Sequence, residues 1–257
     1  VSGVAKRAGL LHYDSYIDAS TLTTNEEIHE AAGKYKIFGR VTPYQKLELV
    51  KALKLGGNVK LANDVTASTT MEIPAGVAVV LDLNGKTLTG TMHKNDGAVI
   101  NNKGTLTIKG GTVKSTAPNG GSALQNAGTA NVVNSTLNGA SNADGSWPSY
   151  TVNNTGKLTL TDANITSVHG GVASYGNGAV VTMNNTNLNM IGIPGFTSHG
   201  LYTYSNGQIV VNGGNIANNA ADQNATGASV INGAVTVNAG TFSGRIENYY
   251  GTPVLKG

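Results

Sequence analysis

The sequence lacks cysteine altogether and is poor in aromatic and charged residues. Among its 257 residues there is no Cys, while aromatic residues make up 5% and charged residues 12%. The absence of cysteine excludes a disulfide framework, a thiolate metal site and a cysteine nucleophile. So few aromatic side chains supply a conventional globular core poorly. The low charge argues against simple disorder, which needs high net charge together with little hydrophobicity.

Long apolar runs and a strong net charge are missing as well. No run of 18 apolar residues occurs, so the sequence predicts no membrane-spanning helix. The formal net charge of +3 is too small to indicate a nucleic acid or an anionic membrane as partner. We therefore expect neither nucleic-acid binding nor membrane insertion, and the residues indicate no cofactor and no metal site.

What the chain does contain is glycine, asparagine and threonine, with charge distributed unevenly. Glycine alone accounts for 35 residues. Residues 1–57 hold fourteen Lys, Arg, Asp and Glu, whereas residues 115–244 hold four, which are Asp144, Lys157, Asp162 and Asp222. A shift of this size indicates a domain boundary. The sequence therefore predicts an N-terminal segment over 1–57 and a second domain over 58–257.

The N-terminal segment contains residues that typically begin and end helices. In "TPYQKLELVKALKLGG", Thr42 is placed as N-cap, Pro43 at the first helical position and Gln45 at a capping-box spacing, and two glycines end the helix. "TTNEEIHEAAGKY" predicts another helix, with acidic residues in its first turn. "YIDA" and "KIFGRV" predict short buried strands. The alternating order predicts a small α/β unit.

The stretch "YIDASTLTTNEEIHEAAGKYKIFGRVTPYQKLELVKALK" resembles the phosphorylation domain of bacterial cation-transporting P-type ATPases, over about the first 54 residues. "FGRVTPYQKLELVKAL" carries the resemblance, and Lys46 matches the lysine that this family brings to its aspartyl-phosphate site. The family's DKTGT motif is absent, and "LGGNVKLANDV" stands where its magnesium-binding GDGxND motif would follow.

Phosphoryl transfer needs a nucleophile and a metal site together, and the single lysine supplies neither. We therefore expect no ATPase activity and interpret Lys46 as a solvated helix lysine. The segment then serves as a cap or attachment piece, or it is a fused fragment, and the sequence leaves both readings open.

From residue 58 onward the sequence is periodic. The repeat can be written as Asn-x-Gly followed by apolar residues at +2, +4 and +9 from the Gly. In "GNGAVVTMNNTNL" the pattern fits with a slip of one residue, and "VVLDLNGKTL" is an earlier, imperfect copy. The clear copies start at Gly104, Gly128, Gly156, Gly207 and Gly233, the slipped copy aligns Val181, Met183 and Leu188, and the imperfect copy has Leu81, Leu83 and Leu88.

Alternation at +2 and +4 predicts a strand with one buried face, and the +9 residue begins a second inward face. The intervening "KGGT", "VNST", "TDAN" and "NAGT" predict corners, because Gly and Asn tolerate positive φ. Each unit is then one coil of short strands. Coils stack in parallel about 4.8 Å apart, and a single coil cannot bury its own inward face.

The stretch "LANDVTASTTMEIPAGVAVVLDLNGKTLTG" resembles the first coil of bacterial surface proteins and phage tailspikes in the pectin-lyase-like superfamily. The resemblance covers roughly 58–257 and implies an all-β solenoid, a single-stranded right-handed parallel β-helix of about seven to eight coils. Leucine-rich repeats need a helix-compatible half, and calcium-binding β-rolls need GGxGxD runs; the sequence has neither. The fold hosts many functions, so it predicts none by itself.

Three insertions follow the +9 residue: "NGASNADGSWPSY", "NMIGIPGFTSHGL" and "ANNAADQNATGA". Stacked coils would place them on one side, and insertions on one face of a repeat protein often form its binding face. Aromatic rings in such loops can stack on sugar rings; the alternative is that they cover the solenoid or pack on a neighbouring chain. The predicted glycan-binding residues are Trp147, Tyr150, Phe196, His199, Tyr202 and Tyr204.

Carboxylates offer only weak catalytic candidates. A glycosidase needs two of them about 5 to 10 Å apart. Asp144 and Asp222 follow coils three steps apart, which separates them by about 14 Å along the axis. Asp162 occupies a corner position held by Gly or Asn in other repeats, so we interpret it as a turn residue.

Other functional clusters are not indicated. Lys157 is the one basic residue of the low-charge region and has no acidic cluster beside it, unlike a pectate-lyase-like calcium site. His169 and His199 have no consistent carboxylate partner in the sequence, so both are interpreted as ordinary loop histidines. A set of asparagines near the repeat glycines predicts an internal amide ladder that satisfies polar groups at a corner. Its members are Asn102, Asn126, Asn154 and Asn177.

The sequence favours a non-enzymatic module located outside the cell, on the cell surface or on a virion. Such a module is a phage fibre or tailspike-like protein or a bacterial adhesin, and it presents loops to a surface polysaccharide or another host-surface glycan. The alternative is a polysaccharide-degrading tailspike hydrolase or lyase. The resemblance also implies a homo-oligomer, such as a trimer.

Overall fold

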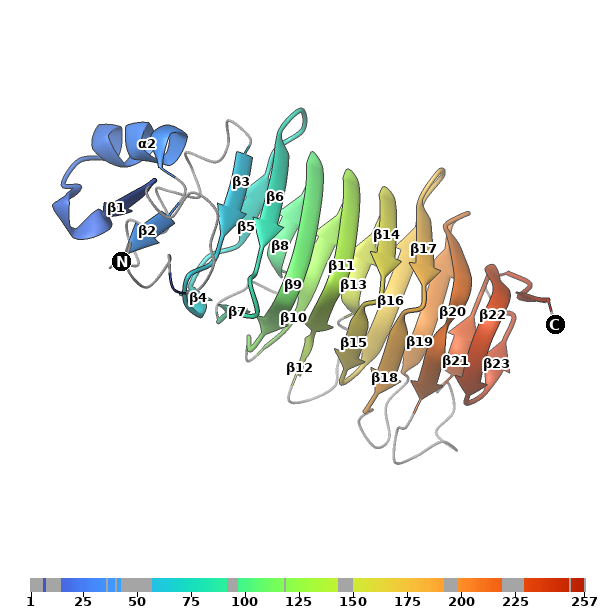
Figure 1. The fold of residues 1–257 in the computed structure, drawn as a ribbon. Helices are drawn as coiled ribbons and strands as arrows, with labels where there is room; N and C mark the ends of the chain where they lie inside the picture. Colours follow the sequence, from blue (N-terminus) through green and yellow to red (C-terminus); the bar gives the residue numbers. More distant parts are fainter. Residues whose placement is uncertain are drawn as a thin grey trace.

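The computed structural model shows a long parallel β-solenoid of about seven turns, preceded by a small α/β unit (Figure 1). Strands from successive turns lie side by side along the molecule, and the C-terminus lies at the end opposite the α/β unit. The predicted all-β parallel solenoid is therefore confirmed. The structure describes residues 7, 15–35, 37–39, 41–42, 57–91, 97–117, 119–142, 150–191, 198–218, 229–249 and 251–256.

The N-terminal unit consists of strand β1 (Tyr16–Asp18), the short helix η1 (Ala19–Thr21), helix α2 (Asn25–Lys34) and strand β2 (Ile37–Gly39). Strands β1 and β2 pair in parallel, and helix α2 lies between them in the sequence. Helix α2 begins where the sequence predicts it: the Glu27 N–H donates to Thr24 Oγ1 over 3.2 Å, and the Thr24 N–H donates to Glu27 Oε2 over 3.1 Å. Both strands and this helix are confirmed, but β1 is not buried as predicted, since Tyr16 is exposed and Ile17 and Asp18 are half-buried. The helix predicted after Thr42 falls on 43–56, outside the described residues.

The solenoid strands form two sheets that run the length of the molecule. The nine-stranded sheet contains β5 (Met71–Ile73), β8 (Ala98–Asn102), β10 (Asn119–Asn126), β12 (Ala140–Asn142), β13 (Tyr150–Asn154), β16 (Gly170–Tyr175), β19 (His199–Tyr204), β21 (Ser229–Asn232) and β23 (Ile246–Glu247). The thirteen-stranded sheet contains β3 (Gly57–Lys60), β4 (Val65–Ala67), β6 (Ala78–Asp82), β7 (Thr87–Gly90), β9 (Thr105–Ser115), β11 (Thr129–Asn138), β14 (Lys157–Thr161), β15 (Asn164–Ser167), β17 (Val180–Asn184), β18 (Asn187–Met190), β20 (Gln208–Asn218), β22 (Val235–Ser243) and β24 (Val254–Leu255).

The register of the thirteen-stranded sheet follows the sequence repeat. Leu158 pairs with Ala130 on one side and with Val181 on the other, as the slipped copy requires. The prediction for the imperfect copy is wrong by two positions for Leu81 and Leu83, whereas Leu88 pairs with Val113 and occupies the predicted +9 position. Leu81 pairs with Ile108, so it occupies the +4 position, and Leu83 lies in a longer corner beyond it.

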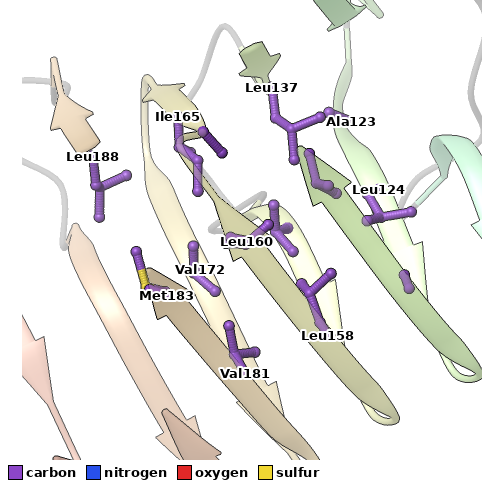
Figure 2. Packing of buried hydrophobic residues seen from close by; sticks show 14 of the residues in the cluster. Ala123, Leu124, Leu137, Leu158, Leu160, Ile165, Val172, Val181, Met183 and Leu188 are labelled. Carbon is purple, nitrogen blue, oxygen red and sulfur yellow. The ribbon is translucent and has the colours of Figure 1, made fainter. Parts of the chain in front are cut away.

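The core is a stack of aliphatic side chains inside the coils. In Figure 2 the side chains of Leu137, Ile165 and Leu188 follow one another from coil to coil. The predicted inward residues are all buried, from 0% to 6% exposed, which confirms the alternation at +2 and +4. They are Leu106, Ile108, Leu158, Leu160, Ile209, Val211, Val235 and Val237.

One row of corner residues turns the chain between the two inward faces. Its members lie at equivalent positions of neighbouring coils and have φ between +46° and +118°. A left-handed conformation is available to Gly and, among other residues, mainly to Asn and Asp. This explains the composition of the row, which is Gly110, Asn134, Asp162, Asn185 and Gly213. The interpretation of Asp162 as a turn residue is confirmed.

The glycine of each Asn-x-Gly repeat is required for a different reason. A Cβ on Gly128 would lie 2.1 Å from the carbonyl oxygen of Gly104, and a Cβ on Gly156 would lie 2.1 Å from that of Gly128. Successive coils therefore approach so closely at this position that no side chain fits between their backbones.

A buried amide ladder crosses the same corner. The side-chain amide of Asn102 donates to Asn126 Oδ1, and that of Asn126 donates to Asn154 Oδ1, each over 2.7 Å. The Asn126 amide also donates to the carbonyl of Lys157 over 3.1 Å, so the ladder satisfies backbone acceptors as predicted. The assignment of Asn177 to this ladder is wrong. Asn177 is exposed, and Ser174 Oγ, 3.4 Å from Asn154 Nδ2, takes its place.

Candidate functional site

Three strands of the nine-stranded sheet begin directly after the predicted insertions. β13, β19 and β21 follow 143–149, 192–197 and 219–228, which lie outside the described residues. Their first residues share one register row: Tyr150 pairs with Gly170, Gly170 with His199, and His199 with Ser229. The described ends of all three insertions therefore emerge along one line on one side of the solenoid.

Four tyrosines lie on three neighbouring strands: Tyr150 of β13 in the row itself, Tyr202 three residues along β19 from it, and Tyr175 of β16 and Tyr204 of β19 five residues along their strands. We call them the tyrosine patch. The ring centroids of Tyr150 and Tyr202 are 5.4 Å apart with an interplanar angle of 26°. Tyr175 pairs in register with Tyr204. Alternation places Tyr202 and Tyr204 on the same side of β19.

Exposure differs strongly within the tyrosine patch. Tyr150 is 8% exposed, whereas Tyr204 is 51% exposed. Tyr175 and Tyr202 are half-buried. Tyr150 is held by the strand beside it, because a Cβ on Gly170 would lie 2.6 Å from its Cδ1 atom. Tyr150 is therefore a packed support, and Tyr204 presents the most open ring of the four.

His199 lies between the tyrosine patch and Ser229 of the neighbouring strand β21. Its ring stacks on Tyr202 with centroids 5.4 Å apart and an interplanar angle of 17°. Its Nδ1 atom lies 2.8 Å from Ser229 Oγ. Burial lowers the pKa of His199 below its ordinary value, and the charges of His169 and Arg245 lower it further, while Glu247 opposes them.

The interpretation of His199 as a loop histidine is wrong, because it is the first residue of β19 and is 9% exposed. Glu247 of β23, two strands further along the sheet, acts to raise its pKa. Glu247 accepts a hydrogen bond from Asn232 Nδ2 over 3.1 Å and forms a salt bridge with Arg245. Residues in register on successive coils can be recognised only when coil lengths are known, and the loops make those lengths unequal.

A polar column on the outer side of the same sheet was not predicted. Glu72 pairs in register with Asn101, and equivalent positions continue strand by strand to Glu247. We call this column the polar track. It consists of Glu72, Asn101, Gln125, Asn153, Ala173, Tyr202, Asn232 and Glu247.

Several side chains of the polar track are held in place by hydrogen bonds. Asn101 Nδ2 donates to both carboxylate oxygens of Glu72, at 3.1 and 2.9 Å. Asn153 Nδ2 donates to Ser122 Oγ over 2.7 Å. Strands β8, β10, β13, β16 and β19 contain no Asp, Glu, Lys or Arg, so the middle of the track carries no formal charge apart from any on His199.

The structure does not place the remaining predicted residues. Trp147 and Phe196 of the predicted glycan site, and the weak catalytic candidates Asp144 and Asp222, lie outside the described residues, as does Lys46. Of the predicted glycan-binding residues, the structure brings together Tyr150, His199, Tyr202 and Tyr204.

Neither a metal cluster nor a membrane span is found in the part of the chain that the structure describes. No group of three or more His, Asp or Glu there could hold a metal ion. No helix among those residues is long and apolar enough to cross a membrane.

Comparison with known proteins finds a similarity to part of one ATPase. A protein from Streptococcus pneumoniae serotype 4 (strain ATCC BAA-334 / TIGR4), named "Probable cation-transporting ATPase exp7", is 43% identical over 58 residues. These residues make up 23% of this chain and 7% of that protein. The similarity agrees in kind with the resemblance seen in the N-terminal segment, and the chain matches only a small part of the ATPase. No protein-family model matches the chain, and no solved structure matches it.

Proposed function

We propose that the protein is a non-enzymatic module outside the cell, on a bacterial surface or a virion, which binds a surface glycan through the tyrosine patch. The observation that carries this proposal is the tyrosine patch, which extends along β13, β16 and β19 from the row where three insertions end. A phage fibre or tailspike-like protein and a bacterial adhesin both fit this description.

Physical chemistry supports a sugar as the ligand. An aromatic ring binds the apolar face of a sugar by stacking and by burying area, and tyrosine adds a hydroxyl that forms hydrogen bonds. Tyr204 has the exposure that such a contact needs, while the buried Tyr150 and His199 hold the neighbouring Tyr202 ring in position. The platform is therefore ordered before the ligand arrives, which lowers the entropic cost of binding.

The proposal is tested with Tyr204→Ala on an array of purified bacterial and plant polysaccharides. Loss of a half-exposed ring removes about 1 to 2 kcal/mol of binding free energy, so we expect the affinity for the bound glycan to fall about tenfold. The melting temperature should stay nearly unchanged, because Tyr204 is not part of the core. Tyr16→Ala, which makes the same change in β1 of the N-terminal unit, is the matched control and should bind like the wild type.

Two results would contradict the proposal. If no polysaccharide binds, or if Tyr204→Ala and Tyr16→Ala bind equally well, the tyrosine patch is not a glycan site. Release of reducing or unsaturated ends during incubation with a bound polysaccharide would instead favour the hydrolase or lyase.

Trp147→Ala extends the test to the insertion before β13, where we expect a similar loss of affinity at unchanged melting temperature.

A further inference from the structure

We propose that the polar track binds an uncharged, linear polysaccharide lying along the solenoid axis, with the tyrosine patch as one part of a longer site. This inference rests on the proposed glycan-binding function and adds the class of glycan and its direction. The track supplies one equivalent position per strand from β5 to β23. Amide side chains occupy it on β8, β10 and β13, the buried Ala173 follows on β16, and Tyr202 of the tyrosine patch occupies it on β19.

The direction follows from the spacing of the coils. Neighbouring strands lie about 4.8 Å apart, so the positions from Asn101 to Asn232 span about 24 Å along the axis. Asn101, Gln125 and Asn153 are half-buried, which fixes their amide groups while leaving part of each side chain accessible. A ligand lying across the solenoid would meet only one of them, whereas a ligand along the axis meets them in succession.

The charge of the track selects an uncharged ligand. Asn101, Gln125 and Asn153 offer amides, each of which donates and accepts hydrogen bonds, as a sugar hydroxyl group also does. The five central strands contain no Asp, Glu, Lys or Arg, and Glu72 stands at one end of the track. Within these described strands nothing compensates the carboxylates of a uronic-acid chain, and Glu72 would repel them, whereas Glu247 at the other end is paired with Arg245.

The experiment measures binding by titration calorimetry with two graded series of linear oligosaccharides. One series is neutral, for example cello-oligosaccharides and manno-oligosaccharides, and the other consists of oligogalacturonates. We expect a neutral series to bind, with an affinity that rises with length and levels off near the 24 Å span. Since no formal charges pair in this site, the affinity should be insensitive to salt.

Substitutions in the polar track then test whether the ligand binds there. Gln125→Ala and Asn153→Ala remove amides two strands or more from Tyr202, and each should weaken binding of the longer oligosaccharides about fivefold, the loss of one net hydrogen bond. The shortest oligosaccharides, which reach only the tyrosine patch, should be affected little. Asn131→Ala removes an exposed amide from β11 of the other sheet and is the matched control.

The outcomes separate this inference from the proposed function. If only oligogalacturonates bind, and Tyr204→Ala weakens them, the glycan site stands and the uncharged ligand is wrong. If neutral oligosaccharides bind without dependence on length or on Gln125 and Asn153, the site stands and the track is wrong. If neither series nor any polysaccharide of the array binds, both proposals fail.

Discussion

Asparagine has two roles in this solenoid, and the direction of the side chain decides between them. Asn102, Asn126 and Asn154 point inward and are buried, so their amides must satisfy one another and nearby carbonyls. Asn212 and Asn238 form a similar ladder on the outer surface, where Asn238 Nδ2 donates to Asn212 Oδ1 over 2.8 Å. Water can replace the outer hydrogen bonds, but it cannot replace the inner ones, so only the inner ladder is essential for folding.

His199 gives the stability of the protein a dependence on pH. Its pKa is lowered in the folded state, chiefly by burial, so between that value and the unfolded value of about 6.5 the unfolded chain binds more protons. The free energy of unfolding should therefore fall as the pH drops below about 6.5 and level off below the folded pKa. His199→Asn keeps a polar atom facing Ser229 but does not titrate, so its stability should depend less on pH.

The measurement is urea unfolding of both proteins at a series of pH values between 7 and 5. The difference in unfolding free energy between the wild type and His199→Asn should be largest near pH 7 and shrink towards pH 5. Parallel pH profiles for the two proteins would show that His199 is not the group responsible.

At the scale of single elements, strand β14 shows how alternation sets the cost of a substitution. Leu160 is fully buried, whereas Thr159, its neighbour on the same strand, points outward and is half-buried. Leu160→Asp places an unpaired carboxylate in the core and should reduce the free energy of unfolding by at least about 3 kcal/mol. Thr159→Asp is the matched control and should cost less than about 1 kcal/mol. Equal costs in denaturant unfolding would mean that the register of β14 is wrong.

The sequence predicts the strands well because their signal is local. Apolar residues at +2 and +4 indicate one buried face, and this pattern is clear enough to reveal the one-residue slip at Val181 and Met183. The failures occur where a coil departs from the average length. Its spacing from a glycine predicts Asn177 in the ladder, but Ser174, three residues earlier, pairs with Asn154 and reaches the inner corner instead.

The antiparallel pairing of β12 with β10 was also not predicted. Ala140 pairs with Gly121 and Asn142 with Asn119, at the point where the chain leaves the regular coil. These segments contain small and polar residues without an alternating pattern, so periodicity carries no signal for them. Their pairing depends on the position of the neighbouring coil.

At the scale of the whole molecule, the candidate site is harder to predict than the fold. The prediction that the insertions gather on one side depends only on stacking, and their described ends do lie in one row. The polar track has no local signature, because its members are separated by whole coils of unequal length. Such a site becomes visible only when the register of every coil is known.

The N-terminal unit lies beyond β3, at the end of the solenoid where the first coil has no preceding neighbour (Figure 1). Strand β3 pairs with β6, and the half-buried Val59 and Leu61 pack against the core close to this end. An open strand edge and apolar surface favour addition of another chain. Removal of residues 1–55 should therefore increase aggregation, measured by light scattering during heating.

A chain that begins at Ser15 keeps β1, α2 and β2 and serves as the control for this truncation. It should remain as soluble as the full chain. If removal of 1–55 changes neither solubility nor melting temperature, the N-terminal unit is a passive appendage and does not cover the end of the solenoid.

The close stacking at the repeat glycines has a consequence for the evolution of this chain. Gly104, Gly128 and Gly156 fit only because each meets an equivalent position of the next coil, and the amide ladder imposes the same condition. A duplication or deletion of part of a coil would bring a side chain against a backbone and is selected against. A whole coil can be gained or lost with every contact restored. The length of the molecule, and with it the distance between its ends and the tyrosine patch, therefore changes in steps of one coil.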